Sequence, residues 1–372
     1  MKVRLRGNRV LRALDALFGR ILILMFKLVK RRRLFPSQIK SIALLKLSGI
    51  GDLILLSGII KDIHQKHPSS KILLFCGSDN AVVAPLLSDV DKVITLPIEN
   101  PFSAMRILRT YSPSLLLDFG QWSRIESLIA YFSKSQYLVG FKTAGQQRHY
   151  LYDKICVHND KVHEIENFRS LAEKVGIQSM TPPTLSLKEE PLSTKLEEIA
   201  NEKCIVFHPW PSGLKSHLKE WPLEYWHQLG NILIANGYYI LVSGSQANFK
   251  ASQSLIERLN NPSYTCNIAG ELSFSQLGYL FEKSKCVITV NTGVMHFASC
   301  LKTFLIALNG PTSIKRWGPL NPEAIALQPD CPNCGYLNLG FEYPKNPPPC
   351  MENISLQKVL EALAMKQLIK RT

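Results

Sequence analysis

Short apolar segments alternate with helix-like segments along most of this 372-residue chain, and this pattern limits its possible folds more than any other feature. Strands joined through helices run parallel, because a parallel pair needs a long crossover connection. In the first half, strands are expected at Ser41–Leu47, Lys71–Cys76, Lys92–Leu96, Ser114–Phe119 and Tyr137–Gly140, and helices at Leu53–Lys66, Ala81–Leu87, Phe102–Tyr111 and Ile125–Phe132. The pattern predicts a doubly wound α/β domain.

A second alternating set fills the other half of the chain. Its expected strands are Cys204–His208, Tyr238–Ser243, Cys286–Val290 and Phe304–Leu308, and its expected helices are Pro222–Asn236, Phe249–Leu259, Ser273–Phe281, Gly293–Cys300 and Leu356–Lys370. The segment 181–191 is rich in proline and charge and is expected to link the halves. We therefore predict an amphipathic helix at 1–36, two Rossmann-like domains at 37–185 and 192–345 that face a cleft, and a C-terminal helix at 346–372.

The net charge of +15 is concentrated near the N-terminus, where residues 1–40 hold twelve basic residues and one acidic residue, Asp15. The remainder of the chain is therefore close to neutral. With 46% hydrophobic and 20% charged residues overall, the composition suits packed cores and excludes a disordered chain.

The segment 10–29 is apolar but is interrupted by Arg12, Asp15, Arg20 and Lys27, too often for a transmembrane helix. A cleaved signal peptide also fits poorly, because four basic residues occupy 30–33 where a small-residue cleavage site belongs. On a helix the basic residues share an arc of about 100°. This favours a helix lying on an anionic membrane surface. The alternative is a helix packed on its own protein, with its basic stripe in solvent. Nucleic-acid binding is a weaker interpretation, because segments that bind nucleic acid are rarely so apolar.

The nine cysteines favour a reducing, cytoplasmic location. Six of them lie in apolar surroundings and are expected to be buried thiols: Cys76, Cys156, Cys204, Cys266, Cys286 and Cys300. The exceptions are Cys331 and Cys334, which form a CxxC pair, and Cys350. A structural zinc site needs four ligands, and no fourth is evident nearby, so a loop with thiols or a labile disulfide is favoured over zinc.

A glycine-containing turn, Gly49-Ile-Gly51-Asp52, follows the first expected strand and opens a helix. Glycines permit a sharp turn, and a carboxylate placed there can act as a general base at a domain edge. The simpler interpretation is that Asp52 only adds negative charge to the helix start.

Three segments of the second half follow strands in the same way. Lys219 precedes an expected helix, where it can bind phosphate as a point charge or remain a solvated lysine. The run 291–296 opens a helix whose backbone N–H groups can hold an anion, with Thr292 adding a hydroxyl and His296 an imidazole, although a single such histidine is more often structural. Thr312 lies in a loop after the next strand.

Together these segments resemble glycosyltransferase family 9, the lipopolysaccharide heptosyltransferase family. The likeness is carried, in order, by 47–52 (LSGIGD), 219–222 (KEWP), 270–273 (GELS), 291–298 (NTGVMHFA) and 310–312 (GPT), with the cysteine-bearing tail at 331–334 and 350–354. It extends from about Ile42 to the C-terminus and so covers nearly all of the globular part.

The resemblance implies a GT-B fold and an inverting, metal-independent transfer that needs no cofactor. Asp52 would be the base that deprotonates the acceptor hydroxyl, in a loop with Ser48, Gly49 and Gly51. The implied donor-binding residues are Lys219, Leu272, Asn291, Thr292, Gly293, His296 and Thr312. The implied partners are a nucleotide-sugar, with ADP-heptose as the best guess, an anionic glycolipid acceptor such as a lipopolysaccharide core, and an anionic membrane reached through 1–36. Nucleic acid is not expected. The implied location is the cytoplasmic face of the inner membrane.

Three features depart from the family pattern. Asn291 stands where the family usually has aspartate, the N-terminal extension is unusually long, and the middle cysteine of the tail is missing. The loss of charge at Asn291 leaves open a different nucleotide-sugar donor or a catalytically silent relative that binds glycolipid or nucleotide-sugar. An epimerase or phosphorylase on the same fold is a further class, and the sequence shows no sign of a pyridoxal-phosphate lysine site.

Overall fold

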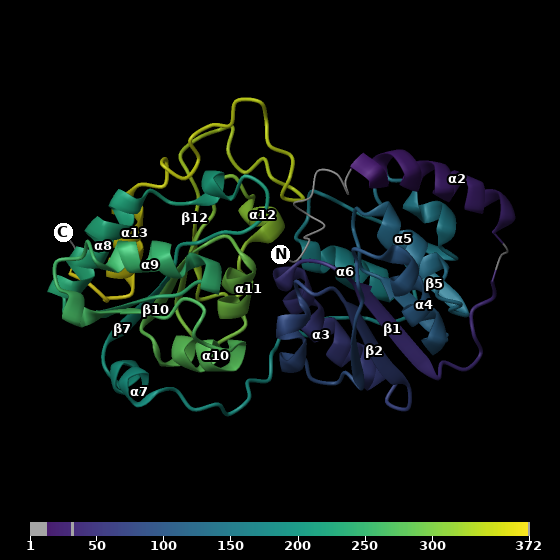
Figure 1. Ribbon diagram of the computed structural model, residues 1–372, viewed down its shortest axis with the longest axis horizontal. Coiled ribbons are helices and arrows are strands. Elements are labelled where there is room, and N and C mark those ends of the chain that lie inside the picture. The colour runs from purple at the N-terminus through teal and green to yellow at the C-terminus, as the bar shows by residue number, and fades with distance from the viewer. Residues whose placement is uncertain (1–12, 31–32, 371–372) are drawn as a thin grey trace. The chain divides into compact units, whose positions relative to one another are not determined.

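The computed structural model describes residues 13–30 and 33–370. The chain divides into two compact units, Met1–Ser186 and Leu187–Thr372 (Figure 1). Each unit is a parallel six-stranded sheet with helices packed on it. The fold class expected from the sequence is therefore confirmed.

The first unit has the strand order β3-β2-β1-β4-β5-β6, with every neighbouring pair parallel. The strands are β1 (Ser41–Lys46), β2 (Lys71–Cys76), β3 (Lys92–Thr95), β4 (Leu115–Asp118), β5 (Tyr137–Lys142) and β6 (Lys154–Val157). Ile42 of the central strand pairs with Ile72 on one side and with Leu115 on the other. The strand order reverses between β1 and β4, which is where ligands bind in open sheets of this kind.

Helices cover both faces of this sheet. They are η2 (Asp15–Gly19), α2 (Arg20–Val29), α3 (Ile50–Lys66), η3 (Ala81–Leu86), α4 (Pro101–Tyr111), α5 (Arg124–Tyr131), η4 (Arg148–Leu151) and α6 (Glu164–Glu173). The face that carries Ala43 and Leu45 packs on α4 and α5. Phe141, which alternation places on the opposite face, contacts Phe168 of α6. The segment expected to be a helix at 81–87 is a 3₁₀ turn, and Pro85 lies within it.

The second unit repeats the same topology with the order β12-β11-β10-β7-β8-β9. Its strands are β7 (Cys204–His208), β8 (Tyr239–Val242), β9 (Thr265–Asn267), β10 (Cys286–Val290), β11 (Leu305–Leu308) and β12 (Ile325–Leu327). Its helices are α7 (Thr194–Asn201), η5 (Ser216–Lys219), α8 (Leu223–Ala235), η6 (Gln246–Asn248), α9 (Phe249–Ile256), η7 (Pro262–Tyr264), α10 (Phe274–Lys283), α11 (Gly293–Ser299), α12 (Ile314–Trp317) and α13 (Leu356–Met365). Here the order reverses between β7 and β10.

Candidate active site

Asp52 lies in the first turn of α3, just beyond the carboxyl end of the central strand β1. Gly49 makes this possible, because its φ of 89° lies in the left-handed region that other residues avoid. Ser48 and Gly49 are half-buried, whereas Gly51 and Asp52 are buried. The structure therefore puts the predicted base at the point where the strand order of the first sheet reverses.

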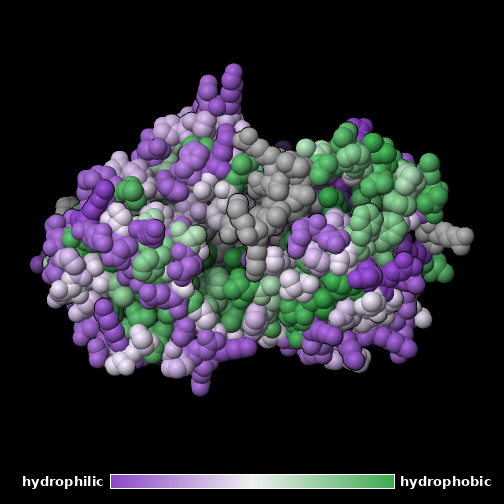
Figure 2. Space-filling model, in the orientation of Figure 1, coloured by the Kyte–Doolittle hydropathy of each residue, from purple (hydrophilic) through white to green (hydrophobic). Residues whose placement is uncertain are grey.

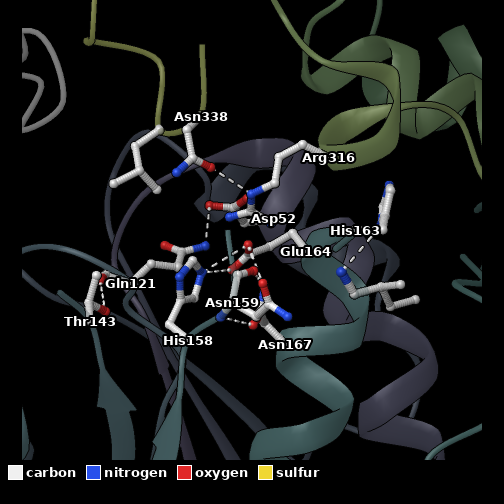
Figure 3. A network of polar contacts seen from close by, with 12 residues as sticks. Asp52, Gln121, Thr143, His158, Asn159, His163, Glu164, Asn167, Arg316 and Asn338 are labelled. Carbon is white, nitrogen blue, oxygen red and sulfur yellow. Dashed lines mark hydrogen bonds and ion pairs between the residues drawn. The ribbon is translucent and has the colours of Figure 1, made fainter. Parts of the chain in front are cut away.

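A buried lysine that the sequence analysis did not select holds Asp52. The Nζ atom of Lys46 lies 2.9 Å from Oδ2 of Asp52, and the two side chains are only 1% and 2% exposed. Lys46 also donates to Oε1 of Gln121 at 2.9 Å, and Nε2 of Gln121 donates to Oδ2 of Asp52 at 3.4 Å. Figure 3 shows Gln121 directed toward Asp52. The three side chains form a closed polar triangle.

A second buried network fixes the strand ends that carry this triangle. The carboxylate of Glu126 accepts the backbone N–H of Leu47 at 3.0 Å, at the start of the Asp52 turn. Burial raises the pKa of Glu126, and the nearby Asp118 adds to the effect. Asp118 itself accepts from Arg148 at 2.8 Å and from the Tyr152 hydroxyl at 2.6 Å. These hydrogen bonds hold the carboxyl ends of β1 and β4 in place.

The carboxyl end of β6 carries a further polar cluster in the same unit (Figure 3). Nε2 of His158 lies 3.2 Å from each carboxylate oxygen of Glu164, which is fully buried at the start of α6. Asn167 donates to the same carboxylate at 3.3 Å. Neither His158 nor Glu164 stood out in the sequence, because nothing in their spacing shows that they meet.

In the second unit, the predicted donor loop lies at the carboxyl end of β10, again where the strand order reverses. Thr292 is the N-cap of α11, and its Oγ1 accepts from the backbone N–H of Val294 at 3.2 Å. Gly293 begins the helix. His296 is buried one turn later, with its ring 6.4 Å from that of Trp317.

Asn291 joins this loop to the next one. Its Nδ2 donates to Oδ1 of Asn309 at 2.6 Å and to the carbonyl of Trp317 at 2.9 Å. Thr312 is buried in the loop after β11 and pairs with Leu337 in an isolated bridge. The structure thus brings Asn291 into contact with Asn309, at the start of the loop that contains Thr312.

Lys219 and Leu272 lie on other loops of the second unit. Lys219 ends the 3₁₀ turn η5 on the connection after β7, and its Nζ donates to the carbonyl of Ser212 at 2.8 Å. Leu272 is half-buried just before α10, which packs on α11 through the rings of Phe274 and Phe297 at 5.1 Å. The strand before Leu272, β9, is separated from β10 by β7 and β8.

Comparison with known proteins identifies the family. The model described as "Glycosyltransferase family 9 (heptosyltransferase)" matches residues 122–334, more than half of the chain. The chain belongs to glycosyltransferase family 9. The resemblance inferred from its motifs is confirmed, and the protein is a glycosyltransferase.

This glycosyltransferase is similar to several heptosyltransferases. It is 24% identical over 310 residues to lipooligosaccharide heptosyltransferase 2 of Haemophilus ducreyi, with 76% of this chain and 86% of the relative covered. Its fold matches the ADP-heptose LPS heptosyltransferase II of E. coli with a TM-score of 0.69 and 20% identity, covering 87% and 98% of the two chains. It also matches E. coli heptosyltransferase WaaC with ADP-2-deoxy-2-fluoro heptose, with a TM-score of 0.65 and 16% identity, covering 88% and 99%.

The cysteine-bearing tail of the glycosyltransferase contains a disulfide between Cys334 and Cys350, while Cys331 is a free thiol. Just after Cys334, the backbone N–H groups of Gly335 and Leu337 donate to the carbonyls of Gly310 and Pro311 in the loop that contains Thr312. Within residues 13–30 and 33–370 no group of three or more histidine, cysteine or acidic side chains is arranged to hold a metal ion. Six cysteines expected to be thiols are free, four of them buried and Cys266 and Cys300 partly buried.

His208 gives the second unit of the glycosyltransferase a predicted pH dependence. It ends β7, its Nδ1 lies 2.9 Å from Oγ of Ser243, and burial lowers its pKa to about 4. Below the ordinary histidine pKa of about 6.5, the unfolded chain binds a proton that the folded chain excludes. We expect the free energy of unfolding to fall by about 3 kcal/mol as pH drops through this window, and to be independent of this group above it.

The His208→Gln variant tests this expectation by urea unfolding at neutral pH and near the folded pKa. Glutamine can still bond Ser243 but does not titrate, so the difference between the two pH values should shrink. An unchanged pH dependence would show that other groups are responsible.

Proposed function

We propose that this glycosyltransferase moves a heptose from ADP-heptose onto a lipopolysaccharide core or a related glycolipid. The names of the similar proteins given above support the donor and the acceptor class. The observation that carries the proposal is the Lys46–Asp52–Gln121 triangle at the sheet position where such folds bind ligands.

In the proposed reaction Asp52 is the general base. An ammonium group at 2.9 Å favours the charged form of a carboxylate, which is the form that accepts a proton. The acceptor oxygen forms a bond to the anomeric carbon while its proton passes to Asp52. The bond from that carbon to the diphosphate oxygen breaks on the opposite side, so the configuration inverts and ADP leaves.

The donor side supplies groups suited to the negative charge that develops on the leaving diphosphate. We assign Lys219 as the cation and Thr292 and Gly293 as the loop that receives the diphosphate, with His296 and Thr312 beside it. Leu272 would contact the base. Lysine and backbone N–H groups stabilise such charge without a metal, and we propose that none is required.

Asn291 supports a second candidate, a donor other than ADP-heptose. Its Nδ2 already donates hydrogen bonds to Oδ1 of Asn309 and to the carbonyl of Trp317, and its amide carries no charge. A carboxylate at this position would accept bonds where the amide donates them. A nucleotide-sugar with a different pattern of hydroxyls is therefore the alternative donor, and a silent binding protein is the less favoured one because the Asp52 triangle is intact.

We place the reaction at the cytoplasmic face of the inner membrane, with residues 1–36 as the attachment. The acceptor class is membrane-bound, and the N-terminal segment carries most of the net charge. Within residues 13–30 and 33–370, no helix has the length and apolar character needed to cross a bilayer.

A direct assay tests the proposal. The full-length protein is incubated with ADP-heptose and a heptose-deficient core glycolipid, with UDP-GlcNAc and a GDP-sugar as comparison donors. We expect ADP release with one heptose added to the glycolipid, an inverted anomeric linkage by NMR, and the same rate in the presence of EDTA. Transfer from only another donor would establish the alternative, and no transfer from any donor would contradict the enzyme assignment for these substrates.

A further inference from the structure

The N-terminal helical segment η2–α2 is fastened to its own unit by a buried acid. Asp15 is 1% exposed, and its Oδ1 accepts the backbone N–H of Ile125 at 2.8 Å. Its Oδ2 lies 3.4 Å from Nη1 of Arg124. Gly19 permits the close approach, because a Cβ there would lie 2.8 Å from the Cβ of Arg124. The segment therefore has a fixed inner side, which lies against the first turn of α5.

Apolar packing continues this inner side toward the end of α2. Ile23 is fully buried in a cluster with Leu128 and Leu151. The ring of Phe26 meets that of Phe132 edge-on at 4.9 Å. Figure 1 shows α2 running beside α5. The helix is thus part of the unit rather than an appended arm.

The described cations at the end of the segment also face the unit. Lys27 lies over the ring of Tyr150 at 4.1 Å, and Lys30 lies 3.9 Å from Asp153. Arg33 donates to the carbonyl of Ser135 at 2.8 Å. Of the basic stripe expected to meet lipid headgroups, Lys27 and Lys30 therefore face the unit and Arg20 is exposed. Its other members, Arg9, Arg12 and Arg31, lie outside the described residues.

The outer side of the segment is apolar and open. We call it the apolar face, and it consists of Leu14, Leu17, Phe18, Ile21, Leu22, Leu24, Met25, Leu28 and Val29, each 37–85% exposed. Leu34 and Phe35, which follow the segment in the sequence, are also exposed, at 89% and 47%. Figure 2 shows hydrophobic side chains gathered over α2. Contiguous apolar surface of this kind marks an interaction site rather than ordinary surface.

We propose that the apolar face lies flat in the interface of an anionic bilayer, and that it, rather than the basic stripe, provides most of the binding. This deepens the membrane attachment proposed above. The helix is fixed along its inner side, so only the outer side is available for insertion, as in interfacial helices. The other cations of residues 1–40 then add attraction to anionic headgroups.

A second copy of the chain fits this face less well than lipid. Two such segments meeting around a two-fold axis would bring together two regions with twelve basic residues and one acidic residue each. The like charges of the two regions would repel each other. An anionic lipid surface would instead attract the basic residues within the helix and on either side of it. Charge complementarity therefore selects the bilayer.

The test uses the full-length protein and vesicles of phosphatidylcholine with phosphatidylglycerol. The variant Phe18→Ser/Ile21→Ser/Leu28→Ser changes positions that are 53%, 58% and 85% exposed, so its fold should persist. The matched control is Phe102→Ser/Val157→Ser/Met180→Ser, which changes side chains of the same unit that are 84%, 66% and 78% exposed. In co-sedimentation we expect the first variant to lose at least tenfold in vesicle partitioning and the control to bind like the parent.

Two further readouts separate the outcomes. At about 1 M salt, where the screening length is about 3 Å, the parent should retain most of its binding. Full release by salt, or unchanged binding of the first variant, would overturn the proposal. A parent dimer that becomes monomeric in the first variant, without vesicle binding by either, would instead identify a second copy as the occupant. Transfer to a detergent-dispersed acceptor should be equal in both variants, because neither changes the proposed active site. A negative result in the vesicle experiments would therefore contradict the membrane proposal and not the proposed reaction.

Discussion

Asp52→Asn is expected to lower kcat for sugar transfer by about 10³-fold, with donor affinity changed by less than about threefold. Asparagine keeps the shape of the side chain and an oxygen that can accept from Lys46, but it cannot take the proton of the acceptor hydroxyl. General bases contribute about 10²–10⁴-fold to such reactions. The rate is measured as ADP release under saturating substrates, and donor affinity by calorimetry with ADP.

The same helix offers a matched control. Asp62 is also a buried aspartate of α3, but its Oδ2 accepts from Oγ of Ser179 at 2.6 Å and from the backbone of Met180 at 3.0 Å, far along the helix from Asp52. Asp62→Asn should reduce stability and leave kcat of the folded protein nearly unchanged. If Asp52→Asn turned over at a near-normal rate, Asp52 would not be the base and the proposed mechanism would fail.

The sheets could be predicted from sequence wherever a strand is buried on both sides. β1 and β10 are buried strands composed mainly of apolar residues, as is typical of central strands in a parallel sheet. The strands that the sequence analysis missed, β6, β9 and β12, lie at sheet edges and are short and partly exposed. An edge strand has one neighbour and less apolar surface to bury, so its sequence carries little periodic signal.

The candidate site was predictable only where a residue follows a strand within a few positions. The sequence analysis selected Asp52 and Thr292 for this reason, and both lie just beyond the carboxyl end of a central strand. Lys46 was passed over because it belongs to an apolar strand, although a lone charge in a strand buried on both faces signals a buried partner. The partner of Lys46 lies in the first turn of α3, and Gln121 lies in the loop after β4, 75 residues along the chain. Tertiary pairing rather than local pattern therefore determines the triangle.

The N-terminal helix shows a similar limit. Its sequence is apolar around most of its circumference, and periodicity cannot say which apolar side is buried. The position of Asp15, the only acidic residue among the first 40, was the sequence feature that indicated the buried side. A carboxylate in such a segment is stable only when paired, and its contact with Arg124 and Ile125 determines which side faces the protein.

Lys46→Met is expected to lower the free energy of unfolding by about 3–5 kcal/mol and to reduce transfer as strongly as loss of the base. Methionine fills a similar volume but removes the positive charge, so the Asp52 carboxylate stays buried without it. Gln121 would keep only its 3.4 Å bond to that carboxylate. Stability is measured by urea unfolding followed by circular dichroism.

The double variant Lys46→Met/Asp52→Asn tests whether loss of the Lys46–Asp52 ion pair causes the loss of stability expected in Lys46→Met. The double variant also removes the buried carboxylate that Lys46 neutralises, so it should be more stable than Lys46→Met alone by about 2 kcal/mol or more. Both variants should be inactive, because Lys46→Met removes the ammonium group beside the Asp52 carboxylate and the double variant removes the carboxylate itself. If the two substitutions destabilised additively, the 2.9 Å contact would contribute no coupling. The loss in Lys46→Met would then come from side-chain packing, and Lys46 would have no part in preparing the base.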